Sequence, residues 1–344
     1  MKGKILVTGG TGYIGSHTVV ELQNSGYEVL IIDNLSNSGA DIVDNIEKIT
    51  GVRPEFEKLD CLDYEGLERF FKKHENIKAI IHFAASKAVG ESVEKPLLYY
   101  RNNLVSLINL LELMPKYNVE GIVFSSSCTV YGQPDQLPVT EKAPIKKAES
   151  PYGNTKQINE EIVQDTVKSG VPIKSILLRY FNPIGAHPSA LIGELPLGVP
   201  QNLVPYITQT AMGIREKLSV FGDDYNTPDG SAIRDFINVV DLAKAHVLSI
   251  DRMLNDKQKD QVEIFNIGTG KGLSVLELIT AFEKATGVKL NYEITKLRAG
   301  DIEQVWADPE YANKELGWKA ETSIEETLLS AWNWQKKLRE KGIQ

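Results

Sequence analysis

A glycine-rich stretch directly behind the first apolar run constrains this chain most. Ile5-Leu6-Val7 is followed by Thr8-Gly9-Gly10-Thr11-Gly12-Tyr13-Ile14-Gly15, which contains both GxxGxxG and GxGxxG spacings. Such spacing requires glycine because the backbone must turn tightly and approach a pyrophosphate, whose charge then meets free N–H groups at a helix N-terminus. The stretch therefore predicts a strand, a dinucleotide-binding turn and a helix.

An acidic residue at the end of the second predicted strand indicates which dinucleotide is bound. Asp33 follows the apolar run 29–32 and lies 18 residues after Gly15. A carboxylate there accepts the adenosine ribose hydroxyls and repels a 2′-phosphate, and no arginine lies nearby to compensate, which favours NAD over NADP. Asp60, at the end of the third strand, is a candidate for contact with the adenine, and a solvated strand-end carboxylate is the alternative.

Short apolar runs alternate with helical stretches from Lys4 to Asn182. The runs are almost continuously hydrophobic, as is typical of strands that are covered on both faces, and they occupy 5–7, 29–32, 79–83, 122–124 and 176–178. Helices are predicted over 13–25, 67–73, 97–114 and 150–170. This alternation predicts an α/β fold with a doubly wound, Rossmann-type parallel sheet that binds its ligands at the strands' carboxyl ends.

The pattern changes after Asn182. Residues 183–205 are rich in proline and glycine and predict a long irregular segment, which in a compact protein is usually functional. Strands over 218–221 and 264–267 and helices over 241–254, 274–286 and 324–339 follow. We expect residues 1–182 to form the NAD-binding domain and 183–344 a smaller mixed α/β substrate domain, with the segment of about 235–267 packing back on the first domain.

Composition excludes several classes of function. The chain has 46 acidic residues against 38 Lys and Arg, a net charge of −8, so no broad basic field attracts nucleic acid or anionic membrane. No uncharged apolar run reaches the length of a membrane span. The two cysteines form no CxxC pair and the five histidines are isolated, so we expect no metal site and a cytoplasmic location. Any bound anion must be held by local groups.

A tyrosine and a lysine fall on one face of a predicted helix. Tyr152 and Lys156 are four residues apart, just after the start signal Ser150-Pro151. An ammonium beside a phenol favours the phenolate and lowers its pKa, and an oxidised nicotinamide adds a second positive charge, so Tyr152 can act as a general base. The spacing alone also occurs on solvated helix faces. Ser127, at the end of the run that begins at Ile122, lies at the same edge of the predicted sheet and favours the catalytic interpretation.

With these residues in view, the chain resembles the UDP-glucose (UDP-galactose) 4-epimerase family of the extended short-chain dehydrogenases/reductases. The resemblance covers nearly the whole length. Its motifs are the glycine stretch, Lys87–Ser92, Ser125–Gly132, Tyr152 with Lys156, Arg179–Pro183, Gly185–Pro188, Asn202-Leu203, Phe221-Gly222, Arg234–Phe236 and Arg298–Asp301.

The resemblance implies a mechanism and a role for each matching residue. Tyr152, directly or through Ser127, would take the proton of the sugar 4-hydroxyl while hydride leaves C4 for tightly bound NAD+. The 4-keto sugar would rotate about its link to the diphosphate, so that hydride returns to its opposite face. Lys156 would hold the nicotinamide ribose. The other residues implied around NAD+ are Gly9, Gly12, Tyr13, Ile14, Gly15, Asp33, Asn34, Asn37, Ser38, Asp60, Cys61, Phe83, Ala84, Ala85, Lys87, Asn102, Ser125, Tyr180 and Phe181. Those implied around the UDP-hexose are Ser127, Thr129, Asn182, Asn202, Leu203, Phe221 (against uracil), Arg234, Arg298, Asp301 (on the uridine ribose) and Val305. A homodimer is also implied.

Several alternatives remain within and beyond this family. A small residue at Val305, where some members carry tyrosine, leaves room for N-acetylated UDP-hexoses. A 4,6-dehydratase would need an acid and a base after Ser127, where this chain has Cys128-Thr129. A UDP-uronate 4-epimerase would need a cation that the sequence does not locate. An inert NAD-sensing regulator could dispense with Tyr152 and Lys156, both of which are present.

Overall fold

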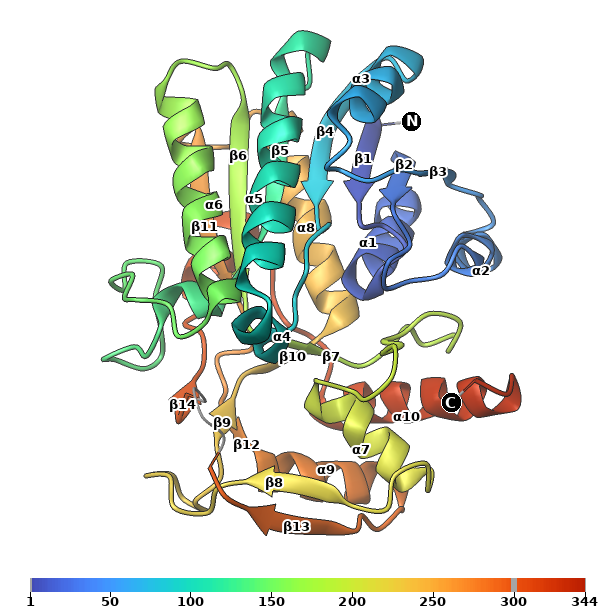
Figure 1. The fold of residues 1–344 in the computed structure, drawn as a ribbon, viewed down its shortest axis with the longest axis vertical. Helices are drawn as coiled ribbons and strands as arrows, with labels where there is room; N and C mark the ends of the chain where they lie inside the picture. The colour runs from blue at the N-terminus through green and yellow to red at the C-terminus, as the bar shows by residue number, and fades with distance from the viewer. Residues whose placement is uncertain (1, 298–301, 344) are drawn as a thin grey trace.

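The computed structural model describes residues 2–297 and 302–343 (Figure 1). Its centre is a seven-stranded parallel sheet in the order β11-β6-β5-β4-β1-β2-β3. The strands are β1 (Lys4–Thr8), β2 (Glu28–Asp33), β3 (Glu55–Lys58), β4 (Ile77–His82), β5 (Gly121–Ser127), β6 (Lys174–Tyr180) and β11 (Val262–Ile267). The strand order reverses between β1 and β4, and in such sheets this reversal opens a crevice at the carboxyl ends of the strands.

Helices cover both faces of the sheet, because alternate residues of each strand point to opposite sides. On one face, α1 (Tyr13–Asn24), α2 (Asp41–Thr50) and α8 (Val239–Leu254) pack against a core that includes Ile5, Val7 and Ile81. On the other face, α3 (Tyr64–Lys73), α5 (Pro96–Leu113) and α6 (Pro151–Lys168) pack against a core that includes Leu6 and Ile80. The predicted α/β class with a doubly wound parallel sheet is confirmed.

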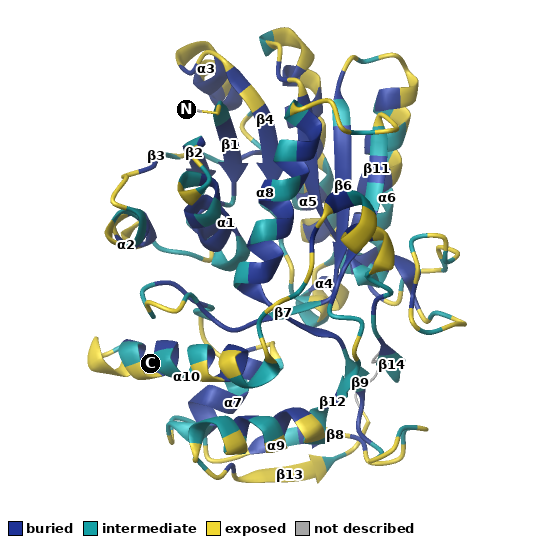
Figure 2. Ribbon diagram, turned by 180° about the vertical axis from the view of Figure 1, so that it is seen from behind, coloured by how far each residue is buried: buried dark blue, intermediate teal, exposed yellow. Residues whose placement is uncertain are grey.

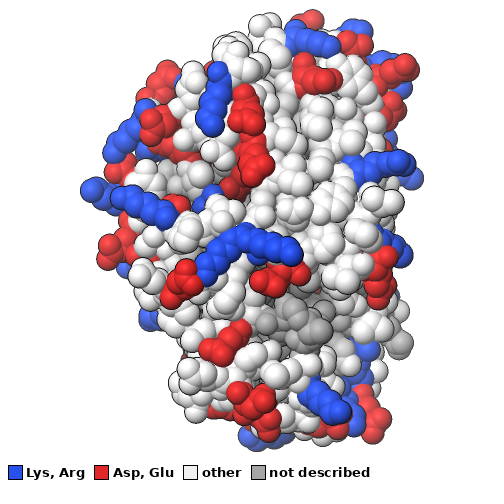
Figure 3. Space-filling view, turned by 60° about the vertical axis from the view of Figure 1, so that its left-hand side comes forward, with Lys and Arg blue, Asp and Glu red and all other residues white. Residues whose placement is uncertain are grey.

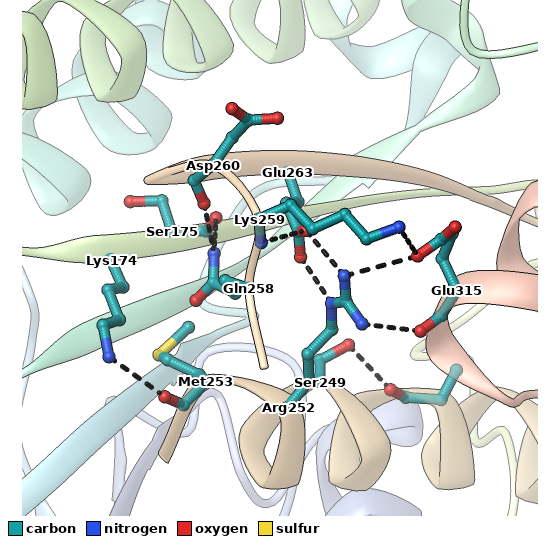
Figure 4. A network of polar contacts seen from close by, with 11 residues as sticks. Lys174, Ser175, Ser249, Arg252, Met253, Gln258, Lys259, Asp260, Glu263 and Glu315 are labelled. Carbon is teal, nitrogen blue, oxygen red and sulfur yellow. Dashed lines mark hydrogen bonds and ion pairs between the residues drawn. The ribbon is translucent and has the colours of Figure 1, made fainter. Parts of the chain in front are cut away.

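The last strand of the sheet comes from the second half of the chain. β11 pairs in parallel with β6, from Val262 opposite Ser175 to Ile267 opposite Tyr180. Figure 4 shows how the start of β11 is fixed to α8. The guanidinium of Arg252 donates to both carboxylate oxygens of Glu263, at 2.6 and 2.7 Å, and to the backbone oxygen of Glu315, at 2.6 Å. The side chain of Lys259 lies 2.6 Å from the Glu315 carboxylate.

A smaller layer lies across the carboxyl ends of the strands (Figure 1). It contains α7 (Leu203–Ala211), the parallel pair β8 (Leu218–Phe221) and β13 (Tyr292–Thr295), α9 (Val275–Thr286) and α10 (Ile324–Glu340). These elements share a core of their own that includes Ile207, Val220, Phe282 and Leu328. Figure 2 shows that β13 is largely exposed, whereas the strands of the main sheet other than the edge strand β3 are mostly buried.

Short strands connect the two layers. β7 (Asn182–Ile184) pairs with β10 (Phe236–Asn238), and β9 (Ile233–Arg234) lies between β12 (Leu273–Ser274) and β14 (Gln304–Val305). The predicted irregular segment 183–205 therefore begins in a strand and ends in the first turn of α7. β3 contains no apolar run that would mark its range, and it ends at Lys58, two residues before Asp60, where its end is predicted.

The surface carries charges of both signs. Figure 3 shows Lys and Arg interspersed with Asp and Glu on one face of the molecule. Within residues 2–297 and 302–343, no helix is both long enough and apolar enough to cross a membrane.

Candidate active site

A large cleft separates the main sheet from the smaller layer. Its volume is about 1490 Å³ and it extends from the glycine turn, past the ends of β2, β4 and β5, to the start of α6 and to segment 193–202. The cleft thus lies where the strand order reverses, at the carboxyl edge predicted from the sequence.

The glycine turn joins β1 to α1 at one end of the cleft. A Cβ at Gly15 would lie 2.2 Å from the Gly9 carbonyl oxygen, and Gly9 has φ +71°, so both positions require glycine. A Cβ at Gly12 would meet only the Gly9 oxygen, at 3.2 Å, and Gly12 lines the cleft. Gly12 is the N-cap of α1 without a side-chain cap, and the first turn holds no acidic residue. The first-turn N–H groups of α1 therefore fit an anion such as a pyrophosphate.

Two carboxylates stand at the strand ends beside this turn. Asp33 is 7% exposed, and its oxygens accept hydrogen bonds from the backbone N–H of Thr11 at 3.2 Å and of Leu35 at 2.9 Å. Asp60 accepts from the Asn34 amide at 2.9 Å. Both carboxylates line the cleft, which suits them to receive the hydroxyl groups of a nucleoside.

The Tyr-Lys pair lies at the start of α6. The hydroxyl of Ser150 accepts from the Gly153 N–H at 3.1 Å and Pro151 takes the first helical position, as the sequence predicts. Lys156 is 3% exposed, and its ammonium donates to the Ser125 carbonyl oxygen at 2.6 Å and stands 5.8 Å from the centre of the Tyr152 ring. Helix capping thus fixes the turn that presents both side chains to the cleft.

The pKa of Tyr152 differs from the expectation. Burial raises it well above its usual value, the neighbouring Tyr180 and Cys128 add to the rise, and the hydrogen bond with Ser127 opposes it. Burial also lowers the pKa of Lys156 to about 8, against the opposing effect of Glu160. The protein groups alone therefore do not lower the pKa of Tyr152 towards neutrality, because the loss of hydration is the largest effect on it.

Alternation along β5 distributes its terminal serines between two environments. Ser125 and Ser127 line the cleft, whereas Ser126 points to the opposite face and donates to Glu160 at 2.5 Å. The Ser125 hydroxyl is hydrogen-bonded to that of Tyr180, and the Ser127 hydroxyl accepts from the Thr129 N–H at 3.2 Å.

Most of the predicted ligand-binding residues meet in this one cleft. Those that line it are Gly9, Gly12, Tyr13, Ile14, Asp33, Asn34, Asn37, Ser38, Asp60, Cys61, Phe83, Ala84, Ala85, Lys87, Asn102, Ser125, Ser127, Thr129, Tyr152, Lys156, Tyr180, Phe181, Asn182, Asn202, Arg234 and Val305. Gly15 and Leu203, in the first turns of α1 and α7, and Phe221, which is 43% exposed on β8, are not among the lining residues. Arg298 and Asp301 lie outside the described residues.

The structure adds residues that the sequence did not single out. Glu194, Gln201, Trp334 and Leu338 also line the cleft. Glu194 and Gln201 lie in the segment without periodicity, and Trp334 and Leu338 lie on α10, far along the chain from every motif. The general prediction that segment 183–205 is functional was the only signal that pointed to Glu194.

Comparison with known proteins places these features in a family. A family model described as GDP-mannose 4,6 dehydratase matches residues 6–330. The chain is 51% identical over 331 residues to a UDP-glucose 4-epimerase of Bacillus subtilis (strain 168), covering 96% of each chain. It is 48% identical to the mouse UDP-glucose 4-epimerase, over 97% of this chain and 96% of that one.

Solved structures agree with these relatives. The UDP-glucose 4-epimerase of Bifidobacterium longum in complex with NAD+ and UDP matches with a TM-score of 0.93 at 48% identity, over 97% of this chain and 98% of that one. That of Stenotrophomonas maltophila, with bound NAD and formylated UDP-arabinopyranose, matches with a TM-score of 0.94 at 46% identity, over 98% and 99%. The chain therefore belongs to the UDP-glucose 4-epimerases of the extended short-chain dehydrogenase/reductase family.

Proposed function

We propose that this chain is an NAD+-dependent 4-epimerase that interconverts UDP-galactose and UDP-glucose through a transient 4-keto sugar. One observation carries the proposal: Tyr152, Lys156 and Ser127 meet in the same cleft as the glycine turn and Asp33. The same cleft thus contains both a dinucleotide-binding site and Tyr152, a group that can exchange a proton with a substrate. The 4-epimerases of Bifidobacterium longum and Stenotrophomonas maltophila, solved with NAD+ or NAD, support the choice of cofactor.

The residues present fit NAD+. The uncapped N-terminus of α1 would hold its pyrophosphate, and Asp33 its adenosine ribose, where a 2′-phosphate would be repelled. Lys156 would hold the nicotinamide ribose. When bound, NAD+ accepts hydride from C4 of the sugar and returns it, so that no net oxidation occurs and the cofactor stays in place.

Tyr152 is the proposed general base. Its hydroxyl would take the proton of the sugar 4-hydroxyl, directly or through Ser127, and would give it back to the 4-keto oxygen from the same position. Burial raises the pKa of Tyr152, so the phenolate needs positive charge close by. Lys156 and the cationic nicotinamide ring of NAD+ would supply it.

The nucleotide sugar would lie between the two layers. Asn182, Asn202 and Arg234 line the cleft on the side of the smaller layer, and with Arg298 they would hold the diphosphate. The N-terminus of α7 has no side-chain cap and adds backbone donors at Leu203. Phe221 would lie against the uracil and Asp301 would bind the uridine ribose. Residues 1–182, with about 235–267, would thus form the NAD-binding domain, and the remainder the UDP-sugar domain.

Acceptance of N-acetylated UDP-hexoses is a second proposed activity. Val305 lines the cleft on β14, is 3% exposed and packs in a cluster with Phe181, Val130 and Tyr131. A short side chain at this place leaves volume beside the sugar's 2-position. We therefore include UDP-N-acetylglucosamine and its galacto epimer among the substrates.

The competing functions fit less well. A 4,6-dehydratase would need an acid and a base beside Ser127, and the next two residues are Cys128 and Thr129. A UDP-uronate epimerase would need a cation at the sugar C6, and an inert NAD sensor would not need Tyr152. Epimerisation of UDP-glucuronate would favour the UDP-uronate epimerase. NAD+ binding without turnover of any UDP-hexose would favour the NAD sensor.

A homodimer is the proposed assembly. Leu97 on α5 is 81% exposed, and Val105 and Ile108 on the same helix are each 37% exposed, about two and three turns further along one face. Val93, on α4 (Val89–Glu94), is 62% exposed. A second copy of the chain would cover this apolar face, and analytical ultracentrifugation measures whether the protein is a dimer.

Cys61 and Cys128 are both free, which supports the proposal of a cytoplasmic location.

The test is turnover of UDP-galactose, followed as UDP-glucose by a coupled dehydrogenase. Tyr152→Phe should lower kcat by roughly 10²- to 10⁴-fold, because a general base is lost, while bound NAD+ is retained. Tyr64→Phe removes a hydroxyl on α3, away from the cleft, and should keep wild-type activity. Undiminished activity of Tyr152→Phe would overturn the catalytic assignment.

A further inference from the structure

The backbone of Glu194 is held in place by contacts with Trp334 on α10. A Cβ at the preceding Gly193 would lie 2.6 Å from the ring of Trp334, so only glycine lets this backbone lie on the indole. The indole N–H of Trp334 donates to the Glu194 carbonyl oxygen at 2.9 Å. The backbone of Glu194 is therefore fixed to α10, although it lies in a segment without a helix or strand of its own.

The carboxylate of Glu194 joins the two sides of the cleft. Its Oε1 accepts a hydrogen bond from the Asn202 amide at 2.5 Å and lies 3.2 Å from the ammonium of Lys87. Lys87 follows β4 on the side of the dinucleotide site, and Asn202 is the N-cap of α7 on the side of the smaller layer. One oxygen atom thus binds a donor from each of the two proposed ligand sites.

Both donors depend on this carboxylate. Asn202 makes no side-chain capping bond to α7, so its amide group is oriented by Glu194 rather than by the helix. Lys87 is 54% exposed along its side chain, whereas Glu194 is only 11% exposed. The ammonium also lies 5.9 Å from the centre of the Tyr13 ring, whose hydroxyl donates to the Gly185 carbonyl oxygen at 2.7 Å.

A negative charge at this place is unfavourable for binding anions unless it has another role. Two diphosphates would lie near Glu194, and each would be repelled by a carboxylate that served no purpose. By holding Lys87 and Asn202 in place, the carboxylate keeps a cation and an amide donor pre-oriented, which reduces the entropy lost on binding.

We propose that Glu194 is a positioning residue that couples binding of the nucleotide diphosphate at Asn202 to retention of NAD+ at Lys87. This inference rests on the proposed function, because it assumes that both ligands bind in the cleft. The Asn202 amide has two N–H donors; when one of them donates to the diphosphate of the substrate, its bond to Oε1 weakens and the ion pair between Oε1 and Lys87 strengthens. The substrate thereby fixes Lys87 over the cofactor, and by linkage the cofactor favours the substrate to the same extent.

The experiment measures release of NAD+ from the purified holoenzyme into an excess of an NAD+-hydrolysing enzyme, with and without saturating UDP. In the wild type, UDP should slow release by about fivefold or more, the lower range of ordinary allosteric coupling. In Glu194→Ala, UDP should change the rate less than about twofold. Glu120→Gln, which removes a carboxylate from the exposed pair with Lys78 away from the cleft, should behave as the wild type.

Two further variants separate coupling from folding. Glu194→Gln keeps the size of the side chain and an acceptor for Asn202 but loses the ion pair with Lys87, and it should lose most of the UDP effect while melting close to the wild type. If Glu194 acts through Lys87, the double variant with Lys87→Met should release NAD+ no faster than the faster single variant. The KM for UDP-galactose should rise in Glu194→Gln with kcat within about twofold.

The outcomes are distinct from those of the proposed function. Wild-type protein without epimerase activity would overturn the proposed function, whatever Glu194 does. An active wild type in which UDP has no effect on NAD+ release would overturn the coupling, and so would a UDP effect preserved in full in both Glu194 variants.

Discussion

Lys156 lies one helical turn after Tyr152, and its ammonium is turned back so that it stands 5.8 Å from the centre of the tyrosine ring while donating to the Ser125 carbonyl oxygen. This hydrogen bond holds the charge near the phenol at a fixed place. Because Lys156 is buried and Tyr152 is half-buried, their protonation states depend strongly on each other and on charged ligands.

Lys156→Met should therefore change the pH profile of the reaction and not only its rate. Loss of the ammonium removes stabilisation of the Tyr152 phenolate, so the rising limb of kcat against pH should move to higher pH. We expect kcat at pH 7 to fall by roughly 10- to 100-fold. This loss is smaller than the loss expected on removal of the general base itself, because Tyr152 is still present. Lys156→Arg, which keeps the charge, should shift the limb less. An unchanged profile in Lys156→Met would contradict the role of the lysine.

Val305→Tyr should narrow the substrate range. The larger side chain would fill space in the cluster with Phe181, so activity on UDP-N-acetylglucosamine should fall by more than about 10-fold relative to activity on UDP-glucose, a discrimination typical of steric exclusion in an apolar pocket. Both activities are measured by chromatographic separation of each substrate from its 4-epimer. Val305→Ala serves as the control and should keep both activities. Wild-type protein inactive on the N-acetylated sugars would refute the prediction.

Glu263→Gln should strongly destabilise the fold. Its carboxylate is 2% exposed and binds Arg252, whose side chain is 8% exposed, so the variant removes the bidentate counter-charge of a buried guanidinium and leaves it the Glu315 carboxylate 3.8 Å away. Loss of one partner of a buried ion pair usually costs about 3–5 kcal/mol of unfolding free energy. Urea unfolding measures this loss. Glu47→Gln, in an exposed pair with Arg53, should cost much less, because solvent screens that pair. Equal effects of the two variants would contradict this interpretation.

Acid should destabilise the protein through its buried histidines. Burial lowers the pKa of His17 and His82 to about 3 and of His246 to about 4. In the unfolded chain these groups take up protons below their usual pKa of about 6.5, whereas the folded protein keeps them neutral. Their contribution to stability is therefore complete above pH 6.5 and declines between pH 6.5 and 4, by on the order of 1 kcal/mol per histidine for each pH unit.

Urea unfolding at pH 7.5, 6 and 5 checks this dependence. His246→Asn should reduce the slope of unfolding free energy against pH by roughly a third, because one of three equivalent sites is removed. A slope that is the same in the variant and the wild type would show that other groups cause the acid sensitivity.

Local sequence patterns predict those parts of the fold that depend on neighbouring residues in the chain, such as strands, helices and tight turns. The run 29–32 lies within β2, the helix predicted over 150–170 is α6, and the glycine turn stands where its spacing indicated. The apolar pattern predicts that α3 starts at Leu67, whereas the helix starts three residues earlier, at Tyr64, because the side chain of Asp63 accepts from the Gly66 N–H and caps it there.

Features that depend on distant pairings could not be read in this way. The run 264–267 was predicted as a strand, but its register against β6 is determined by packing between residues far apart in the chain. Glu194 carries no local pattern, since its position depends on Trp334, 140 residues further along. The contacts that the family resemblance implied for the nucleotide sugar stay predictions until a ligand is observed.

The pairing of β11 with β6 also affects how the protein is made. The ribosome must add roughly 80 residues after Tyr180 before Val262 emerges, which takes roughly 4–16 seconds at common elongation rates. During this interval the edge of β6 lacks its native partner, and an unpaired edge of a hydrophobic strand readily pairs with other chains. Nascent chains stalled between residues 181 and 261 should therefore depend on chaperones more than chains released after residue 267.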